Sequence, residues 1–284
     1  MRPFCILPIL MLIASGQDVV FKTEARLVEV YATVHDQHGR YVDGLTSEQF
    51  RVLDEGEVQS VVAFESQGSA LSCALVLDTT GSMQNTLPLV KNAAVSLIDE
   101  LRAGDSVAVY GFSTSLNLLQ DFTEDRAAAK RALLRTRASG ATALFDALAQ
   151  VTRDISKRQG KKVIVVFTDG ADNASVLRAQ SAIIRAKKCG IPIYTVAEGE
   201  ALQSRELLNQ LRSIAEGSAG VFYEAKKNAD IGPIFRYILA SLQHTYMLTY
   251  KPPTVDGSKW RVIKLSLVSP TDCRIRAKEG YFPE

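Results

Sequence analysis

The sequence predicts an α/β protein in which a doubly wound, mostly parallel sheet is inserted into a small β-sandwich-like domain. In the middle region, residues 70–243, continuously apolar strands alternate with amphipathic helices, which is typical of a parallel sheet covered on both faces. The two flanks, 24–67 and 245–284, show short half-polar strands and turns instead. Because the flanks are alike, we expect them to form one domain that the middle region interrupts.

The middle region supplies five strands and six helices of the predicted fold. The stretch 163–167 is wholly apolar, as a strand buried on both faces must be, and helix 87–101 repeats apolar residues every three or four positions. The expected strands are 71–77, 105–112, 161–168, 191–196 and 220–223, with a short edge strand at 116–120. The expected helices are 87–101, 126–134, 142–157, 176–189, 204–215 and 231–242.

The flanks have the pattern of a half-buried antiparallel sheet. Val28, Val30 and Val34 alternate with polar residues, and the segments 50–54 and 58–64 enclose Glu55-Gly56, which predicts a hairpin. The C-terminal strands are expected at 246–250, 260–268 and 274–278. We therefore divide the chain into residues 1–16, 17–67, 68–244 and 245–284.

The first sixteen residues indicate export. A single early cation, an apolar run and small residues before position 17 have the order of a secretory signal peptide. No later stretch is long and apolar enough to span a membrane, so we expect a secreted, periplasmic or cell-envelope protein without a transmembrane span in the mature chain. The net charge of +2 lacks the basic footprint of a nucleic-acid binder. The oligomeric state and the pairing of Cys189 with Cys273 stay open.

The candidate site consists of oxygen-bearing residues at strand ends. Asp78, Thr80 and Ser82 follow the apolar strand 71–77 at every second position, and Asp169 follows strand 161–168. Thr142 stands where we expect the helix 142–157 to begin. Since ligands of open parallel sheets bind beyond the carboxyl ends of the strands, both aspartates belong to the same edge. Each motif alone is common in a turn or helix cap, but their joint placement at one edge favours a shared site.

Two carboxylates and three hydroxyls, without Cys or His, are the donors of a hard cation, Mg2+ (or Mn2+ or Ca2+). A divalent ion balances the charge of two carboxylates. The coordination shell then has room for one outside anion, and an Asp or Glu carboxylate of a partner protein can replace one water there.

Residues 74–83 resemble the opening of a von Willebrand factor type A domain. That family carries Asp-x-Ser-x-Ser, then a Thr, then an Asp, as a metal-ion-dependent adhesion site. The resemblance implies a Rossmann-like fold over about residues 70–243, with Asp78, Ser82 and Thr142 as ligands and Asp169 as a residue that often acts through water. Thr80 replaces the commoner Ser but keeps its hydroxyl. The segments 42–50, 52–56, 142–147 and 276–281 are similar to secreted bacterial proteins of this type, well represented in acidobacteria.

Two other functions remain open at this stage. A metal-dependent hydrolase would need a general base beside the metal, and Glu198, after strand 191–196, is the acidic residue that could approach the same edge. A purely structural domain with no bound metal is the other. We expect a protein-binding module rather than an enzyme.

Overall fold

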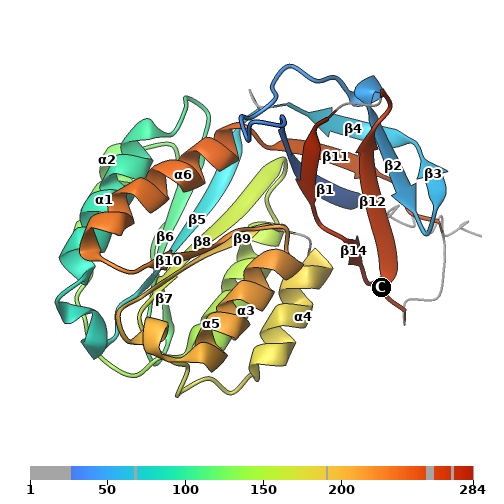
Figure 1. The fold of residues 1–284 in the computed structure, drawn as a ribbon. Helices are drawn as coiled ribbons and strands as arrows, with labels where there is room; N and C mark the ends of the chain where they lie inside the picture. The colour runs from blue at the N-terminus through green and yellow to red at the C-terminus, as the bar shows by residue number, and fades with distance from the viewer. Residues whose placement is uncertain (1–26, 67–68, 190, 254–258, 270–271, 284) are drawn as a thin grey trace, which may run out of the picture.

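The computed structural model describes residues 27–66, 69–189, 191–253, 259–269 and 272–283. The predicted signal segment, residues 1–16, lies outside the described residues. The chain forms an α/β unit and a β unit that lie side by side (Figure 1).

The centre of the α/β unit is a six-stranded sheet with the strand order β10-β9-β8-β5-β6-β7. All neighbouring pairs are parallel except β6 and β7. The strands are β5 (Leu71–Asp78), β6 (Ser106–Phe112), β7 (Leu116–Thr123), β8 (Lys161–Thr168), β9 (Ile193–Glu198) and β10 (Phe222–Ala225). The mostly parallel, doubly wound sheet predicted from the sequence is confirmed, and its antiparallel edge strand is longer than expected.

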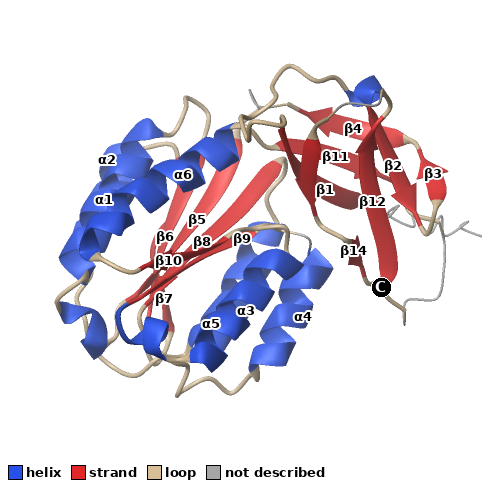
Figure 2. Cartoon of the chain, in the orientation of Figure 1, coloured by secondary structure: helices blue, strands red, loops and turns tan. Residues whose placement is uncertain are grey.

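Helices cover both faces of this sheet (Figure 2). On one face α1, α2 and α6 pack on Leu75, Leu77 and Val196, and on the other α3, α4 and α5 pack on Val76 and Ala197. The alternation of strand side chains between two apolar layers explains why these strands are apolar throughout. The helices are α1 (Leu87–Glu100), α2 (Arg126–Leu134), α3 (Leu144–Ser156), α4 (Ala179–Cys189), α5 (Arg205–Gly217) and α6 (Ile231–Gln243).

The β unit consists of two four-stranded sheets with the orders β13-β1-β11-β4 and β14-β12-β2-β3. Each sheet mixes strands from both ends of the chain, and Val30, Val52 and Tyr246 belong to one apolar core between them. The α/β unit therefore interrupts the β unit in sequence. The strands are β1 (Val28–His35), β2 (Phe50–Asp54), β3 (Glu57–Gln59), β4 (Val61–Glu65), β11 (Tyr246–Tyr250), β12 (Arg261–Leu267), β13 (Arg274–Ala277) and β14 (Gly280–Tyr281).

One prediction for the β unit was wrong. The stretch 58–64, expected as one hairpin strand, divides into β3, which pairs with β2, and β4, which pairs with β11 in the other sheet. Two short strands that change sheets at a corner cannot be told from one longer strand by alternation alone.

A buried carboxylate ties the β unit together. Asp54 has no exposed surface and accepts hydrogen bonds from the hydroxyls of Tyr250 at 2.9 Å and Tyr281 at 2.8 Å. Arg261 Nε donates to its other oxygen at 2.8 Å. These partners come from β11, β14 and β12, so a single acidic side chain links three C-terminal strands to β2.

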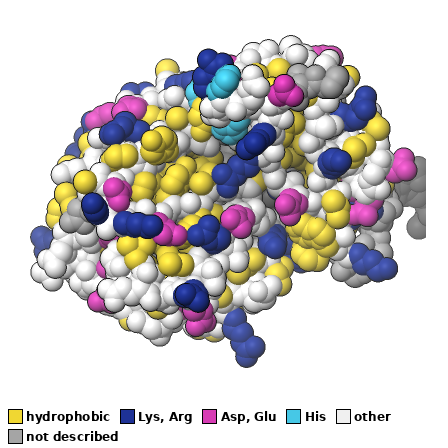
Figure 3. Space-filling view, viewed as in Figure 1, with side chains coloured by type: hydrophobic (Ala, Val, Ile, Leu, Met, Phe, Trp, Pro, Cys, Tyr) yellow, Lys and Arg dark blue, Asp and Glu magenta, His cyan; other side chains and the backbone are white. Residues whose placement is uncertain are grey.

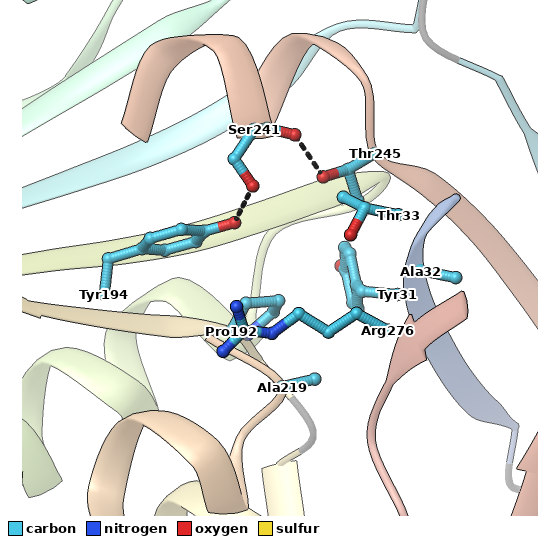
Figure 4. Close-up of a pocket in the computed structure, with 9 residues that line it drawn as sticks. All are labelled: Tyr31, Ala32, Thr33, Pro192, Tyr194, Ala219, Ser241, Thr245 and Arg276. Atoms are coloured by element: carbon cyan, nitrogen blue, oxygen red, sulfur yellow. Dashed lines mark hydrogen bonds between the residues drawn. The ribbon is translucent and has the colours of Figure 1, made fainter. Parts of the chain in front are cut away.

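The two units meet along a polar junction. Figure 4 shows a small cavity there, where Tyr194 of β9 shares a 2.7 Å hydrogen bond with Ser241 of α6, and Arg276 of β13 reaches in from the β unit. Histidine side chains gather at the upper edge of the view in Figure 3. The ring of Tyr41 stacks on that of His244, at the end of α6, with ring centroids 4.4 Å apart.

Candidate metal centre

Asp78, the last residue of β5, is held from two sides. Its Oδ1 accepts the backbone N–H of Thr80 at 2.9 Å, and its Oδ2 accepts the hydroxyl of Thr168 at 2.7 Å. Thr168 ends the neighbouring strand β8, directly before Asp169. Sequence reasoning missed Thr168, although its place beside an acidic residue at a strand end was a usable signal. The carboxylate of Asp78 is thereby fixed at the carboxyl edge of the sheet.

A chain of hydroxyls joins the Asp78 segment to Asp169. Ser82 Oγ donates to Asp169 Oδ1 at 2.8 Å, and Thr80 Oγ1 lies 3.0 Å from Ser82 Oγ. Because a hydroxyl has one hydrogen and Ser82 uses its own on Asp169, Thr80 is the donor of the second bond. The structure thus brings together four of the five predicted residues, Asp78, Thr80, Ser82 and Asp169.

Thr142, the fifth predicted residue, faces the same turn. A Cβ atom placed on Gly170 would lie 3.3 Å from Thr142 Oγ1 and 3.9 Å from Ser82 Oγ, so both hydroxyls border one point. Thr142 does not begin the helix as expected: α3 begins at Leu144 after Ala143. Its backbone N–H donates to Asn173 Oδ1 at 2.9 Å, and its carbonyl accepts from the backbone of Asn173. This pairing with another loop, rather than helix geometry, positions Thr142.

Acidic residues near this loop have structural roles. Asp172 accepts the backbone N–H of Phe145 at 2.9 Å and the hydroxyl of Ser175 at 2.6 Å. Asp146 accepts the backbone N–H groups of Val176 and Leu177 at 2.8 and 2.9 Å. These bonds fasten the segment after Asp169 to the first turn of α3, where orphan N–H groups need acceptors.

The two carboxyl groups of the site, those of Asp78 and Asp169, are both buried. Asp78 is fully buried and Asp169 is 3% exposed. Burial raises the pKa of Asp78, and burial together with the neighbouring charges of Asp78 and Glu200 raises the pKa of Asp169 to about 6. Among the residues that the structure describes, no Lys or Arg forms an ion pair with either carboxylate.

A third buried carboxyl group, that of Glu198, lies close to Asp78 and Asp169. Glu198, the last residue of β9, is 2% exposed, and its Oε1 is a buried side-chain oxygen without a hydrogen-bond partner among the described residues. Burial, together with repulsion from Asp169 and Asp78, raises its pKa to about 7. Glu198, expected from the sequence to approach this edge of the sheet, therefore lies close to both aspartates.

The donor set fits a divalent cation. Three buried acids without a basic partner repel one another, and a bound cation would remove that repulsion. Within the described part of the chain no three His, Cys, Asp or Glu side chains are grouped to hold a metal ion by themselves. Hydroxyl oxygens of Thr80, Ser82 and Thr142 would therefore have to complete the shell, as hard oxygen donors that suit Mg2+.

The family model of the von Willebrand factor type A domain matches residues 73–236, more than half of the 284-residue chain. The chain belongs to this family. Domains of this kind are often adhesion or protein-binding modules. Among the described residues, no helix is both long enough and apolar enough to pass through a membrane.

Individual proteins that resemble this chain share less than a third of its residues over the matched segments. The uncharacterized protein sll0103 of Synechocystis sp. is 29% identical over 157 residues, which are 52% of this chain and 36% of the relative. The von Willebrand factor type A structure from Catenulispora acidiphila has a TM-score of 0.55 at 16% identity and covers 92% of this chain and 74% of its own. That likeness extends beyond the family-matched segment into the β unit.

The D319A mutant of the PilB minor pilin from Streptococcus sanguinis has a TM-score of 0.51 at 16% identity, over 63% of this chain and 62% of its own. This chain thus spans about a third of the curated relative and under two thirds of the pilin. At these identities the structures show a common fold.

Proposed function

We propose that this chain is an exported, metal-ion-dependent protein-binding module. The cation, Mg2+ or alternatively Mn2+ or Ca2+, would be held by Asp78, Thr80, Ser82 and Thr142, with Asp169 acting directly or through a water. The hydrogen bond from Ser82 to Asp169 carries the proposal, because it joins segments 87 residues apart around two buried, unpaired carboxylates.

An acidic side chain of a partner protein would complete the shell. Two ionised aspartates balance one divalent ion, so the ion keeps enough electrophilic character to bind a further carboxylate in exchange for water. The similarity of the fold to that of a minor pilin supports an extracellular place of action. The β unit would then hold the α/β unit away from the cell.

The experiment compares the wild type with Asp78→Asn, an isosteric change that removes one charge. Mg2+ and Mn2+ binding is measured by calorimetry on the folded protein, whose integrity is checked by circular dichroism. We expect micromolar to millimolar binding by the wild type and none by Asp78→Asn. Equal binding by both proteins would mean that the cation lies elsewhere.

The partner is tested separately. Immobilised wild type is exposed to envelope extract in Mg2+ and in EDTA, with Asp78→Asn as the matched control. We expect retained protein only for the wild type in Mg2+, and competition by short peptides with an Asp or Glu side chain. Turnover of ester or phosphate substrates in Mg2+, without capture, would favour the metal-dependent hydrolase instead.

A further inference from the structure

Glu198 is positioned at the same sheet edge as the two aspartates. In the pairing of β8 with β9, Thr168 lies opposite Ala197, so Asp169 and Glu198 each follow a paired position at adjacent strand ends. The next residue, Gly199, has a φ of 55°, and a Cβ placed there would lie 3.2 Å from Asp169 Cβ. The backbone after Glu198 therefore packs directly against Asp169.

The side chain of Glu198 lies on the inner side of the site. Val196, two residues earlier, belongs to the core under α1 and α6, and alternation puts Glu198 on that same face. Thr86, directly before α1, lies close enough to the carboxyl group of Glu198 to lower its pKa. Oε1 of Glu198 is buried and has no hydrogen-bond partner among the described residues.

An unpartnered buried carboxyl oxygen is costly to a folded protein. Burying a polar atom without a hydrogen bond forfeits its hydration with nothing in return, and the loss is larger if the group is charged. Val or Ile would fill the position without that cost. The arrangement is explained if a cation nearby compensates the charge of Glu198.

We infer that Glu198 is the third acidic residue of the cation centre and strengthens cation binding through its negative charge from behind Asp78 and Asp169. This inference rests on the proposed cation site. Since no three acidic side chains of the described residues are grouped closely enough to hold an ion by themselves, Glu198 acts through charge or a bridging water rather than as a third direct carboxylate ligand. The charge of Glu198 then adds to the negative charges of Asp78 and Asp169 in the cation centre.

The test is Glu198→Gln, with Glu200→Gln as the matched control. Both changes remove one negative charge, but Glu200 is exposed in the turn that follows β9 and is screened by water. Calorimetry with MgCl2 or MnCl2 alone should show that Glu198→Gln weakens affinity about 10-fold or more, as for other residues that support metal ligands. For Glu200→Gln the loss should stay within about twofold.

Thermal unfolding separates this charge from a structural role. In EDTA, Glu198→Gln should melt at a higher temperature than the wild type because it removes a buried, uncompensated acid. In saturating Mg2+ the wild type should gain more than the variant. Lower stability of Glu198→Gln in both conditions, or an unchanged Mg2+ affinity, would overturn the inference.

The outcomes also separate this inference from the proposed function. If the wild type binds no cation, both fail together. If Asp78→Asn abolishes binding while Glu198→Gln binds as the wild type does, only the role of Glu198 fails. An equal loss of Mg2+ affinity in Glu198→Gln and Glu200→Gln would also overturn the role of Glu198. The loss would then follow from the net charge of the protein rather than from the buried position of Glu198.

Discussion

Ser82 donates its hydroxyl hydrogen to Asp169 Oδ1 at 2.8 Å, although 87 residues separate them in the chain. The bond connects the turn after β5 with the turn after β8, across two neighbouring strands of the central sheet. It fixes the direction of the Asp169 carboxylate and leaves the lone pairs of Ser82 Oγ for Thr80 or for a cation. The metal centre we propose depends on this contact.

Replacing Ser82 by Ala should weaken Mg2+ binding about 10-fold or more, because a donor oxygen and the support of Asp169 are lost together. The structure should remain folded, since only one hydroxyl is removed. Ser96→Ala, a change of the same type at an exposed position of α1, is the matched control. Calorimetry measures both affinities, and equal values would remove Ser82 from the site.

Cation binding should weaken as the pH falls from about 8 to 5. Asp169 and Glu198, with pKa values of about 6 and about 7, take up protons in this range, and a protonated acid neither binds nor attracts a cation. Mg2+ titrations at several pH values measure the effect. An affinity independent of pH between 5 and 8 would contradict the raised pKa values.

The stability of the metal-free protein should show the opposite pH dependence. Acids whose pKa is higher in the folded state than in the unfolded chain stabilise the folded state when they are protonated. This stabilising contribution is fully present below about pH 4. It is lost as the pH rises through the folded values of about 6 and about 7. Urea unfolding in EDTA between pH 4 and 8 should therefore show a smaller loss for Asp169→Asn than for the wild type. A parallel loss in both proteins would assign the dependence to other groups.

Asp54→Ala should strongly destabilise the β unit. The change leaves Tyr250, Tyr281 and Arg261 without their shared buried acceptor, and breaking a buried charged pair costs about 3 to 5 kcal/mol. Glu57→Ala, at an exposed position of the neighbouring strand β3, is the control and should be nearly neutral. Urea unfolding measures both free energies, and a loss under about 1 kcal/mol for Asp54→Ala would contradict this role.

Gly220→Ala should destabilise the junction of the two units. A Cβ at Gly220 would lie 2.0 Å from the carbonyl oxygen of Ile193, so the backbone beside β9 would have to move, at a cost of about 1 to 3 kcal/mol or more. The control is Gly232→Ala in α6, where the nearest atom is 3.7 Å away and the helix gains up to about 1 kcal/mol. Thermal melts of the two variants should shift in opposite directions; a shift in the same direction would contradict the close approach.

The strands of the central sheet were predictable because burial on both faces leaves a continuous apolar run. The stretch 161–168 coincides with β8, and 71–77 falls one residue short of β5 (Leu71–Asp78). Asp78 and Asp169 could be placed at one edge for the same reason, since parallel strands end on the same side. In the β unit, the division of 58–64 into β3 and β4 was not predictable, because both pieces alternate alike.

The site was predictable only in its residue types. The helix pattern around Thr142 suggested a helix start, but the side chain and the backbone of Asn173 hold it in a loop. Thr168 ends an apolar strand, and the apolar pattern gives no sign that its hydroxyl has a special role. The register of β5 against β8 brings this hydroxyl to Asp78. The pattern near Glu198 indicated a strand end without showing which way its side chain points.

The parallel sheet, the interrupted β flanks and the oxygen donors at the strand ends follow from local periodicity and residue chemistry, so they can be predicted from the sequence alone. Which donors meet, how deeply the acids are buried and that Glu198 lies beside them can be seen only in the folded protein. Register, loop pairing and desolvation arise only when distant segments pack together. The hydrogen bond between Ser82 and Asp169 belongs to this second group.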